Sequence, residues 1–404
     1  MISPQQICQM VDENQDEAIR CLQEIVQTPS VTGDEEPVSK VFAKWIEACG
    51  IPVERYAAET GRPNLIAEWF GSEKGKRFIF NGHMDVFPPS AGDPGIYGPW
   101  AGKLVDGYMY GRGTVDMKGG DCAALMAVTF LRRMGFDPKG SVVLSYMVDE
   151  ENGGWKGVKY LISKGLLKGD FGLCMEPTNG RILNRHRGRL CMKFTYTAQP
   201  HHASTPHPST DALKKAVTAI NRLYAMDADL SQRVDDHGAA TRCLSVTMLN
   251  AGNTPNVQPG LAEFIVDRRV DMDEGMENAK AQILAIFDEL KVKDPEYEYQ
   301  YEILSDRPLL DVPDDHPFLQ IVARSYEQIM DKPAKLYIRA GGSDAASLFQ
   351  AYGIAMPNFG AAPDFDENGV GDPYGSGTPN ERLSIKDYLD SIKYYMMTVV
   401  NALS

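Results

Sequence analysis

The stretch SVVLSYMVDEENGG, residues 141–154, joins a run of strand-forming residues to two adjacent glutamates, Glu150 and Glu151. We expect a strand at 141–147, with the glutamates in the loop beyond it. On either side the pattern alternates, with further strands at 64–70, 77–80 and 171–175 and helices at 117–134 and near 155–164. Strands alternating with helices predict crossover connections, and therefore an α/β fold with a mixed, mostly parallel sheet flanked by helices.

The predicted elements in the remainder of the chain fall into two groups. Helices are expected at 4–28 and 35–49, and again at 316–330, 343–350 and 385–400, interleaved with short strands. Between them, strands at 189–198, 241–249, 261–270 and 297–303 and helices at 211–225 and 274–290 form a plausible two-layer α+β unit. We therefore predict a discontinuous domain, residues 1–186 and 309–404, interrupted by an inserted α+β domain at 187–308.

Composition excludes several classes of protein. The 404 residues include 41 Lys+Arg and 55 Asp+Glu, a formal charge of −14, so we expect neither nucleic acid nor an anionic membrane surface as a partner. The 7 cysteines are odd in number and widely spaced, which indicates free thiols in a reducing compartment. With neither a signal-peptide pattern nor an apolar run long enough to cross a bilayer, a cytoplasmic protein is expected.

Three of the four candidate ligand sites follow predicted strands, and the fourth, Asp116, lies in a glycine-rich loop just before a predicted helix. Beyond the carboxyl ends of parallel strands, residues that are distant in sequence converge in space. One imidazole with several carboxylates is a nitrogen and oxygen donor set, which suits Zn²⁺, Co²⁺ or Mn²⁺. The residues are His83 and Asp85 in FNGHMD, Asp116 in GRGTVDMKGG, Glu150 and Glu151 in MVDEENGG, and Glu176 in CMEP.

Each of these signals has an ordinary structural explanation beside the functional one. Asp85, two residues after His83, is spaced to fix the tautomer of a metal-bound imidazole, but a hydrogen-bonded histidine at a strand end has the same sequence. Glu150 and Glu151 fit either a division between base and ligand or two solvated loop carboxylates.

Two other motifs point less clearly to a chemistry. The glycine-rich loop around Asp116 lacks the order of residues of a phosphate-binding loop, so a nucleotide site is not expected. QPHHASTPH places His201, His202 and His207 together, which fits a functional cluster or a plain polar loop. No cysteine has the context of a catalytic dyad.

Taken together, the motifs resemble the M20 family of metal-dependent peptidases and deacylases. The resemblance is carried in order by NGHMDV (81–86), YGRGTVDMKGG (110–120), DEENGG (149–154), CMEPT (174–178), HHASTPH (201–207), NTPNVQPG (253–260), GGSDA (341–345) and TPNER (378–382). It implies a zinc-peptidase-like catalytic domain with an inserted lid and dimerisation domain. It also implies a hydrolase for an amide bond in an N-acyl amino acid or small peptide.

The resemblance assigns roles to individual residues around the metal. Asp116 is similar to the carboxylate that bridges two metals, with His83 and Glu176 completing the first site and Glu151 belonging to the second. Glu150 resembles the general base that takes a proton from water and returns it to the leaving amine.

Further roles fall in the inserted domain and near its end. His202 resembles the lid histidine that reaches the active site of a neighbouring subunit in a homodimer and stabilises the oxyanion. Asn256, Arg269 and Arg339 are similar to residues that hold a substrate carboxylate or oxyanion. The two arginines also fit a structural role in ion pairs.

One position departs from the family pattern. Members usually carry a histidine just before the segment corresponding to TPNER, as a ligand of the second metal, and here that position is Gly377. No histidine follows His316, so a shift of alignment does not restore it. Substitutes would have to come from the acidic residues of the same loop, Asp364, Asp366, Glu367 and Asp372.

Three functions therefore compete. The first is an amide hydrolase with one or two divalent metals, Zn²⁺ first among them, and Glu150 as base. The second is a hydrolytic deaminase or amidohydrolase that acts on an unusual small substrate with one metal. The third is a non-catalytic small-molecule-binding protein that keeps the fold.

Overall fold

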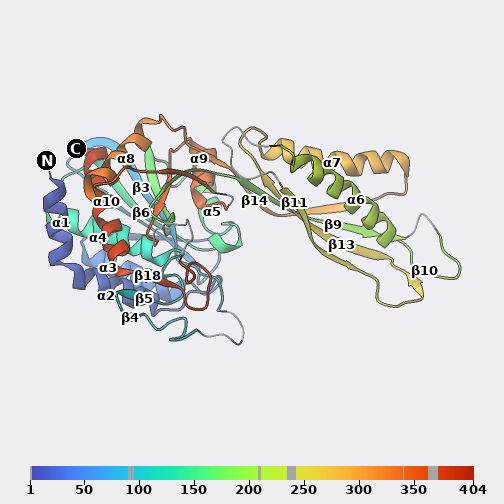
Figure 1. The fold of residues 1–404 in the computed structure, drawn as a ribbon, viewed down its shortest axis with the longest axis horizontal. Helices are drawn as coiled ribbons and strands as arrows, with labels where there is room; N and C mark the ends of the chain where they lie inside the picture. Colours follow the sequence, from blue (N-terminus) through green and yellow to red (C-terminus); the bar gives the residue numbers. More distant parts are fainter. Residues whose placement is uncertain are drawn as a thin grey trace. The chain divides into compact units, whose positions relative to one another are not determined.

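The computed structural model describes residues 2–89, 92, 95–207, 211–233, 243–339, 341–362 and 372–404. They form two compact units (Figure 1). Unit 1 comprises Met1–Arg185, Val312–Tyr337 and Ser343–Ser404, and unit 2 comprises His186–Asp311 and Ile338–Gly342. The expected insertion at 187–308 lies within unit 2, which also includes a short segment much later in the chain.

Unit 1 is built on a mixed sheet whose central strands are parallel. Its order runs β1-β2-β6-β3-β7-β17-β8, and the pairs β6–β3, β3–β7 and β7–β17 are parallel, whereas the outer pairs are antiparallel. This confirms the mostly parallel sheet. The strands are β1 (Val53–Ala57), β2 (Pro63–Phe70), β3 (Glu73–His83), β6 (Lys139–Met147), β7 (Phe171–Pro177), β8 (Ile182–His186) and β17 (Asn358–Gly360).

Helices pack on this sheet, and α4 is central among them. Residues 118–128 of α4 are all buried, Lys118 and Asp121 included, and from Cys122 to Val128 the helix is apolar on every side. The expected single helix at 4–28 is two helices, because the chain departs from helical geometry at Asn14. The helices are α1 (Pro4–Glu13), α2 (Gln15–Val26), α3 (Glu36–Ala48), α4 (Lys118–Arg133), α5 (Val158–Ser163), α8 (Pro317–Met330), α9 (Asp344–Tyr352) and α10 (Ile385–Leu403).

Several short strands lie in unit 1 or where the chain passes from one unit to the other. A short antiparallel sheet of β4, β5 and β18 brings the C-terminal segment beside the loop that precedes Asp116. These strands are β4 (Lys103–Val105), β5 (Tyr108–Tyr110) and β18 (Arg382–Ser384), with β15 (Leu310–Asp311) and β16 (Leu336–Arg339) at the borders. Within the described ranges, no helix is both long and apolar enough to span a bilayer.

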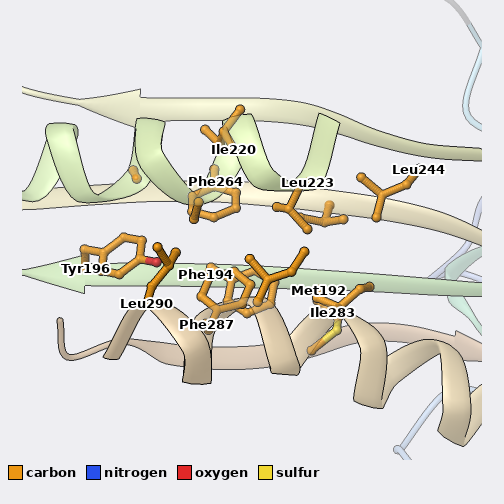
Figure 2. Close-up of a cluster of buried hydrophobic side chains, with 14 of the residues drawn as sticks. Met192, Phe194, Tyr196, Ile220, Leu223, Leu244, Phe264, Ile283, Phe287 and Leu290 are labelled. Carbon is orange, nitrogen blue, oxygen red and sulfur yellow. The ribbon is translucent and has the colours of Figure 1, made fainter. Parts of the chain in front are cut away.

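Unit 2 is a two-layer α+β sandwich with its own core. Its antiparallel sheet has the order β11-β13-β9-β14, and the helices α6 and α7 lie along it (Figure 1). Alternate residues of β9 and β13, such as Phe194 and Phe264, meet Phe287 of α7 in that core (Figure 2). The elements are β9 (Gly188–Thr197), β10 (His201–His202), α6 (Ala212–Leu230), β11 (Cys243–Ala251), β12 (Val257–Gln258), β13 (Leu261–Val270), α7 (Met276–Lys293) and β14 (Gln300–Arg307).

Candidate metal centre

The predicted ligands of unit 1 meet at the carboxyl ends of its parallel strands. His83 is the last residue of β3, and Glu176 lies near the end of the neighbouring strand β7. Glu150 and Glu151 begin the single 3₁₀ turn Glu150–Asn152, three residues after β6 ends. Asp116 lies two residues before α4. The sequence therefore identified residues that the fold brings together.

His83 presents one ring nitrogen to a cluster of carboxylates. Its Nδ1 is 2.8 Å from the backbone carbonyl of Asp85, to which it donates, so in the neutral imidazole Nε2 is the nitrogen without a proton. Nε2 lies 3.3 Å from Asp116 Oδ1, 3.7 Å from Glu176 Oε1 and 3.9 Å from Glu150 Oε2. A buried imidazole nitrogen facing carboxylate oxygens is the arrangement that a divalent cation needs.

The unsatisfied atoms of the cluster fit such a cation. Within the described part of the chain, His83 Nε2, Asp116 Oδ1 and Glu151 Oε1 are buried without a hydrogen-bond partner. Two sets of three donors lie close enough to share an ion: His83, Glu150 and Glu176, and His83, Asp116 and Glu151. Nitrogen and oxygen donors at this spacing suit Zn²⁺ and similar divalent metals. The residues present therefore fit a metal centre.

The protonation of the cluster follows from its burial and crowding. Burial by itself lowers the pKa of His83, but the carboxylates of Asp116 and Glu176 outweigh it, and the pKa lies well above the ordinary value. Burial, together with the charge of Asp116, raises the pKa of Glu151 to about 10. Without a cation the cluster thus retains protons, which a bound metal would have to displace.

Asp85 has a different geometry from the one expected. Its backbone carbonyl, rather than its carboxylate, accepts from His83 Nδ1, although the carboxylate lies 3.6 Å from that nitrogen. The carboxylate accepts instead from the backbone N–H groups of Glu150 and Glu151, at 3.1 and 3.3 Å, and from the hydroxyl of Thr32. Asp85 therefore holds both the imidazole and the turn that carries the glutamates.

A buried ion-pair network also holds the turn that carries Glu150 and Glu151. Arg62 donates to both carboxylate oxygens of Glu35, at 2.8 and 2.5 Å, and to Asp149 at 3.1 Å. Asp149 has a left-handed backbone, with φ at 69°, and its other carboxylate oxygen accepts from the backbone of Lys156. The network holds the residue that precedes Glu150 in an unusual conformation.

Sequence reasoning assigned no role to Glu381, which organises the loop of Asp116. This buried carboxylate accepts from the backbone N–H groups of Val115 and Asp116, at 2.9 and 3.2 Å, and from Arg112 at 2.9 Å. Burial raises the pKa of Glu381, although the hydrogen bonds counteract it. Glu381 belongs to TPNER and Arg112 to GRGTVD, and no local pattern in either motif predicts that these two residues pair across 269 residues of the chain.

The loop where the family histidine was expected has no such ligand in its described residues. Gly377 has a left-handed φ of +77°, and the neighbouring Ser376 donates its hydroxyl to Asp116 Oδ2 at 2.8 Å. Asp372 is instead paired with Arg382 at 3.0 Å. The other proposed substitutes, Asp364, Asp366 and Glu367, lie outside the described residues.

His202 and Asn256 lie together in unit 2. His202 pairs with Val257 in the small β10–β12 sheet, and Ala203 N–H donates to the Asn256 carbonyl at 2.9 Å. The Nδ1 of His202 accepts from the backbone N–H of Ser204 at 3.2 Å, so the ring proton of a neutral imidazole is on Nε2. The exposed Nε2–H is then available as a hydrogen-bond donor.

Arg269 lies at the other end of the unit 2 sheet. It stands near the end of β13, where its Nε donates to Asp267 at 3.1 Å, whereas Asn256 precedes the first strand residue, Leu261. The eight residue steps from Leu261 to Arg269 span about 27 Å of extended chain. Arg339 donates hydrogen bonds of 3.4 Å to the backbone carbonyls of Gly341 and Gly342. Within unit 2, His202 and Arg269 therefore do not share one small-molecule site.

The fold and the donor set are those of an α/β protein with a candidate divalent-metal centre. The chain belongs to peptidase family M20/M25/M40, whose sequence profile matches residues 79–401. It is therefore a hydrolase of amide or peptide bonds, and this membership sets aside the non-catalytic alternative.

Curated relatives and solved structures agree with this assignment. Succinyl-diaminopimelate desuccinylase from Xanthobacter autotrophicus is 30% identical over 338 residues, which cover 80% of this chain and 85% of the relative. The enzyme of that name from Methylobacterium radiotolerans is 33% identical over 282 residues, 66% of this chain and 70% of the relative.

The structural likenesses extend over nearly the whole chain. A putative aminohydrolase from methicillin-resistant Staphylococcus aureus has a TM-score of 0.77 at 18% identity, covering 99% of this chain and 100% of the other. A dinuclear metal binding peptidase of the M20 family from Bacillus subtilis has a TM-score of 0.68 at 17% identity, covering 97% and 99%. At these identities the likeness shows the fold.

Proposed function

We propose that this protein hydrolyses an amide bond in an N-acyl amino acid or small peptide, with a divalent metal at the His83 cluster and Glu150 as general base. The observation that carries the proposal is the free Nε2 of His83, buried among the carboxylates of Asp116, Glu150 and Glu176. Zn²⁺ is the preferred metal because it favours mixed nitrogen and oxygen donors, with Co²⁺ and Mn²⁺ as alternatives.

Glu150 is held where a proton acceptor is needed. A divalent metal, when bound, lowers the pKa of water and polarises the amide carbonyl. Glu150 takes the proton from the attacking water as the new C–O bond forms, and it donates a proton to the nitrogen as the C–N bond breaks. The backbone of Glu150 is itself held in place, because its N–H donates to the Asp85 carboxylate at 3.1 Å. His83, Asp116, Glu151 and Glu176 would hold the metal.

The substrate class follows from the relatives and from unit 2. Two curated relatives are named for the removal of a succinyl group, so we propose N-succinyl and N-acetyl amino acids as the first substrates to test. Arg269 and Arg339 would bind the substrate carboxylate, whereas Asn256, which lies beside His202, would bind the carboxylate or oxyanion at the site of a partner subunit. A planar guanidinium suits a carboxylate, and Asp267 already holds Arg269 in place.

A substrate panel tests this function directly. Protein loaded with Zn²⁺, Co²⁺ or Mn²⁺ should release a free amine from at least one N-succinyl or N-acetyl amino acid or dipeptide, measured by mass spectrometry. Removing the metal with a chelator should abolish this turnover, and adding the metal back should restore it. If no metal-loaded form hydrolyses any member of the panel, the proposal is wrong.

Hydrolytic deamination is a second candidate. The observation that favours it is Gly377, which supplies no side chain where a second metal's ligand was expected. The same panel, extended to small aromatic and cyclic amines, distinguishes the two: ammonia release without cleavage of an acyl group would favour the deaminase.

We further propose that His202 serves the active site of a second subunit in a homodimer. The support is the separation of His202 from Arg269 along β13, together with the free donor on His202 Nε2. One unit 2 cannot present both ends of a strand about 27 Å long to one small substrate. A partner's unit 2 would supply the missing group.

Mixing two inactive variants measures this sharing. His202→Ala and Glu150→Gln dimers should each be inactive, whereas a mixed dimer has one site with both native residues. After exchange of subunits we expect activity to recover to about a quarter of the native value, because half of the dimers are mixed and each has one intact site. No recovery in verified mixed dimers would contradict a shared site.

A further inference from the structure

We propose that the centre holds one divalent metal per chain and that Ser376 and Gly377 set this number. The inference rests on the proposed metal-dependent function and concerns how many metals the chain's own residues support. A structural neighbour from Bacillus subtilis is described as a dinuclear metal binding peptidase of the same family, so a single metal would be a property of this chain.

The first argument is that both candidate donor sets need the same atom. His83 occurs in the set with Glu150 and Glu176 and again in the set with Asp116 and Glu151. Its Nδ1 is engaged with the Asp85 carbonyl at 2.8 Å, so only Nε2 has a lone pair to give. One lone pair binds one metal. Among the described residues, therefore, either set can be completed with the histidine, but not both at once.

The second argument concerns Asp116, the carboxylate that would have to bridge two metals. A bridge uses one carboxylate oxygen for each metal. Oδ1 is buried and faces His83 at 3.3 Å, but Oδ2 accepts the hydroxyl of Ser376 at 2.8 Å. The Ser376 hydroxyl thus takes one of the lone pairs of Oδ2, and it competes with a second metal for this oxygen.

The third argument is that the loop has room for a ligand and lacks one. Among the residues that the structure describes, a Cβ built on Gly377 would meet only Phe87 Cδ2, at 4.0 Å, so the packing of these residues does not forbid a side chain there. The left-handed φ of +77° favours glycine, although histidine tolerates this region better than most residues. Loss of the second metal's ligand is therefore a property of the residue at this position, which a substitution can reverse.

Metal stoichiometry tests the proposal without an activity assay. After equilibrium dialysis against Zn²⁺, the native protein should retain one equivalent per chain, and with Mn²⁺ it should give the electron paramagnetic resonance spectrum of an isolated ion. The double variant Ser376→Ala/Gly377→His should approach two equivalents, and its Mn²⁺ spectrum should show coupling between two ions. Ser376→Thr keeps the hydroxyl, so this variant should still bind one equivalent of Zn²⁺ per chain.

Single variants keep the test decisive if the double variant does not fold. Ser376→Ala alone should bind a second Zn²⁺ at least about tenfold more tightly than the native protein, the scale of effect known for groups that contact metal ligands. Two equivalents in the native protein would overturn the proposal. If the combined variant Asp364→Asn/Asp366→Asn/Glu367→Gln then lost the second equivalent, the acidic loop would be its source.

The outcomes separate this inference from the proposed function. Two bound metals together with amide hydrolysis would support the proposed function and contradict the single-metal proposal. One tightly bound metal with no hydrolysis of any panel substrate would support the single-metal proposal and contradict the proposed function. Unchanged stoichiometry in both Ser376→Ala and the double variant would show that Ser376 and Gly377 do not set the number of metals.

Discussion

Replacing Glu150 with glutamine is expected to lower kcat by roughly 10²–10⁴-fold, the range for loss of a general acid–base group. Glutamine keeps the size of the side chain and its oxygen near His83, but its amide cannot accept the proton of the attacking water. The backbone of the turn should be unaffected, because Asp85 holds it through the N–H groups of Glu150 and Glu151. Steady-state kinetics on the best panel substrate measure the effect.

Metal content decides how the result is interpreted. Because Glu150 belongs to one of the two donor sets, it could act as a ligand rather than as a base. If Glu150→Gln retains its metal and loses turnover, the base assignment holds. Loss of the metal together with turnover would make Glu150 a ligand, and unchanged turnover would exclude both roles. Glu73→Gln, an exposed glutamate at the start of β3, is the matched control.

The fold could be predicted largely because local patterns repeat with a clear period. The parallel centre of the sheet follows from the short apolar runs 77–80, 141–147 and 171–175, which lie in β3, β6 and β7 and have helices α4 and α5 between them in the chain. The break at Asn14 was missed because α1 and α2 both keep apolar residues at helical spacing across it. Short strands such as β4 and β5 have three residues each, too few to show any period.

The site was predictable as a set of residue types but not as a geometry. His83 and Glu176 converge because the fold brings the carboxyl ends of its parallel strands to one edge, whereas Asp116 reaches them from the loop before α4. That the backbone of Asp85, rather than its carboxylate, accepts from His83 depends on side-chain rotamers. The hydrogen bond from Ser376 to Asp116 joins residues 260 positions apart, and no local pattern predicts it.

Replacing Arg62 with methionine is expected to destabilise unit 1 by about 3–5 kcal/mol, the cost of leaving buried charges without their partner. Arg62 is 5% exposed, Glu35 is fully buried and Asp149 is 4% exposed, so water cannot replace the guanidinium. All four tryptophans of the sequence lie in unit 1. Their fluorescence during urea unfolding therefore reports the stability of that unit alone.

Two further variants separate the buried charge from the loss of packing. Arg55→Met removes an exposed arginine of β1 and should change the free energy of unfolding by less than about 0.5 kcal/mol. Combining Arg62→Met with Glu35→Gln removes one of the stranded carboxylates and should recover part of the lost stability. If the double variant is no more stable than Arg62→Met, the penalty comes from lost contacts. Because Asp149 precedes Glu150 directly, the network that stabilises unit 1 also positions the proposed base, and Arg62→Met should lower kcat even where the protein remains folded.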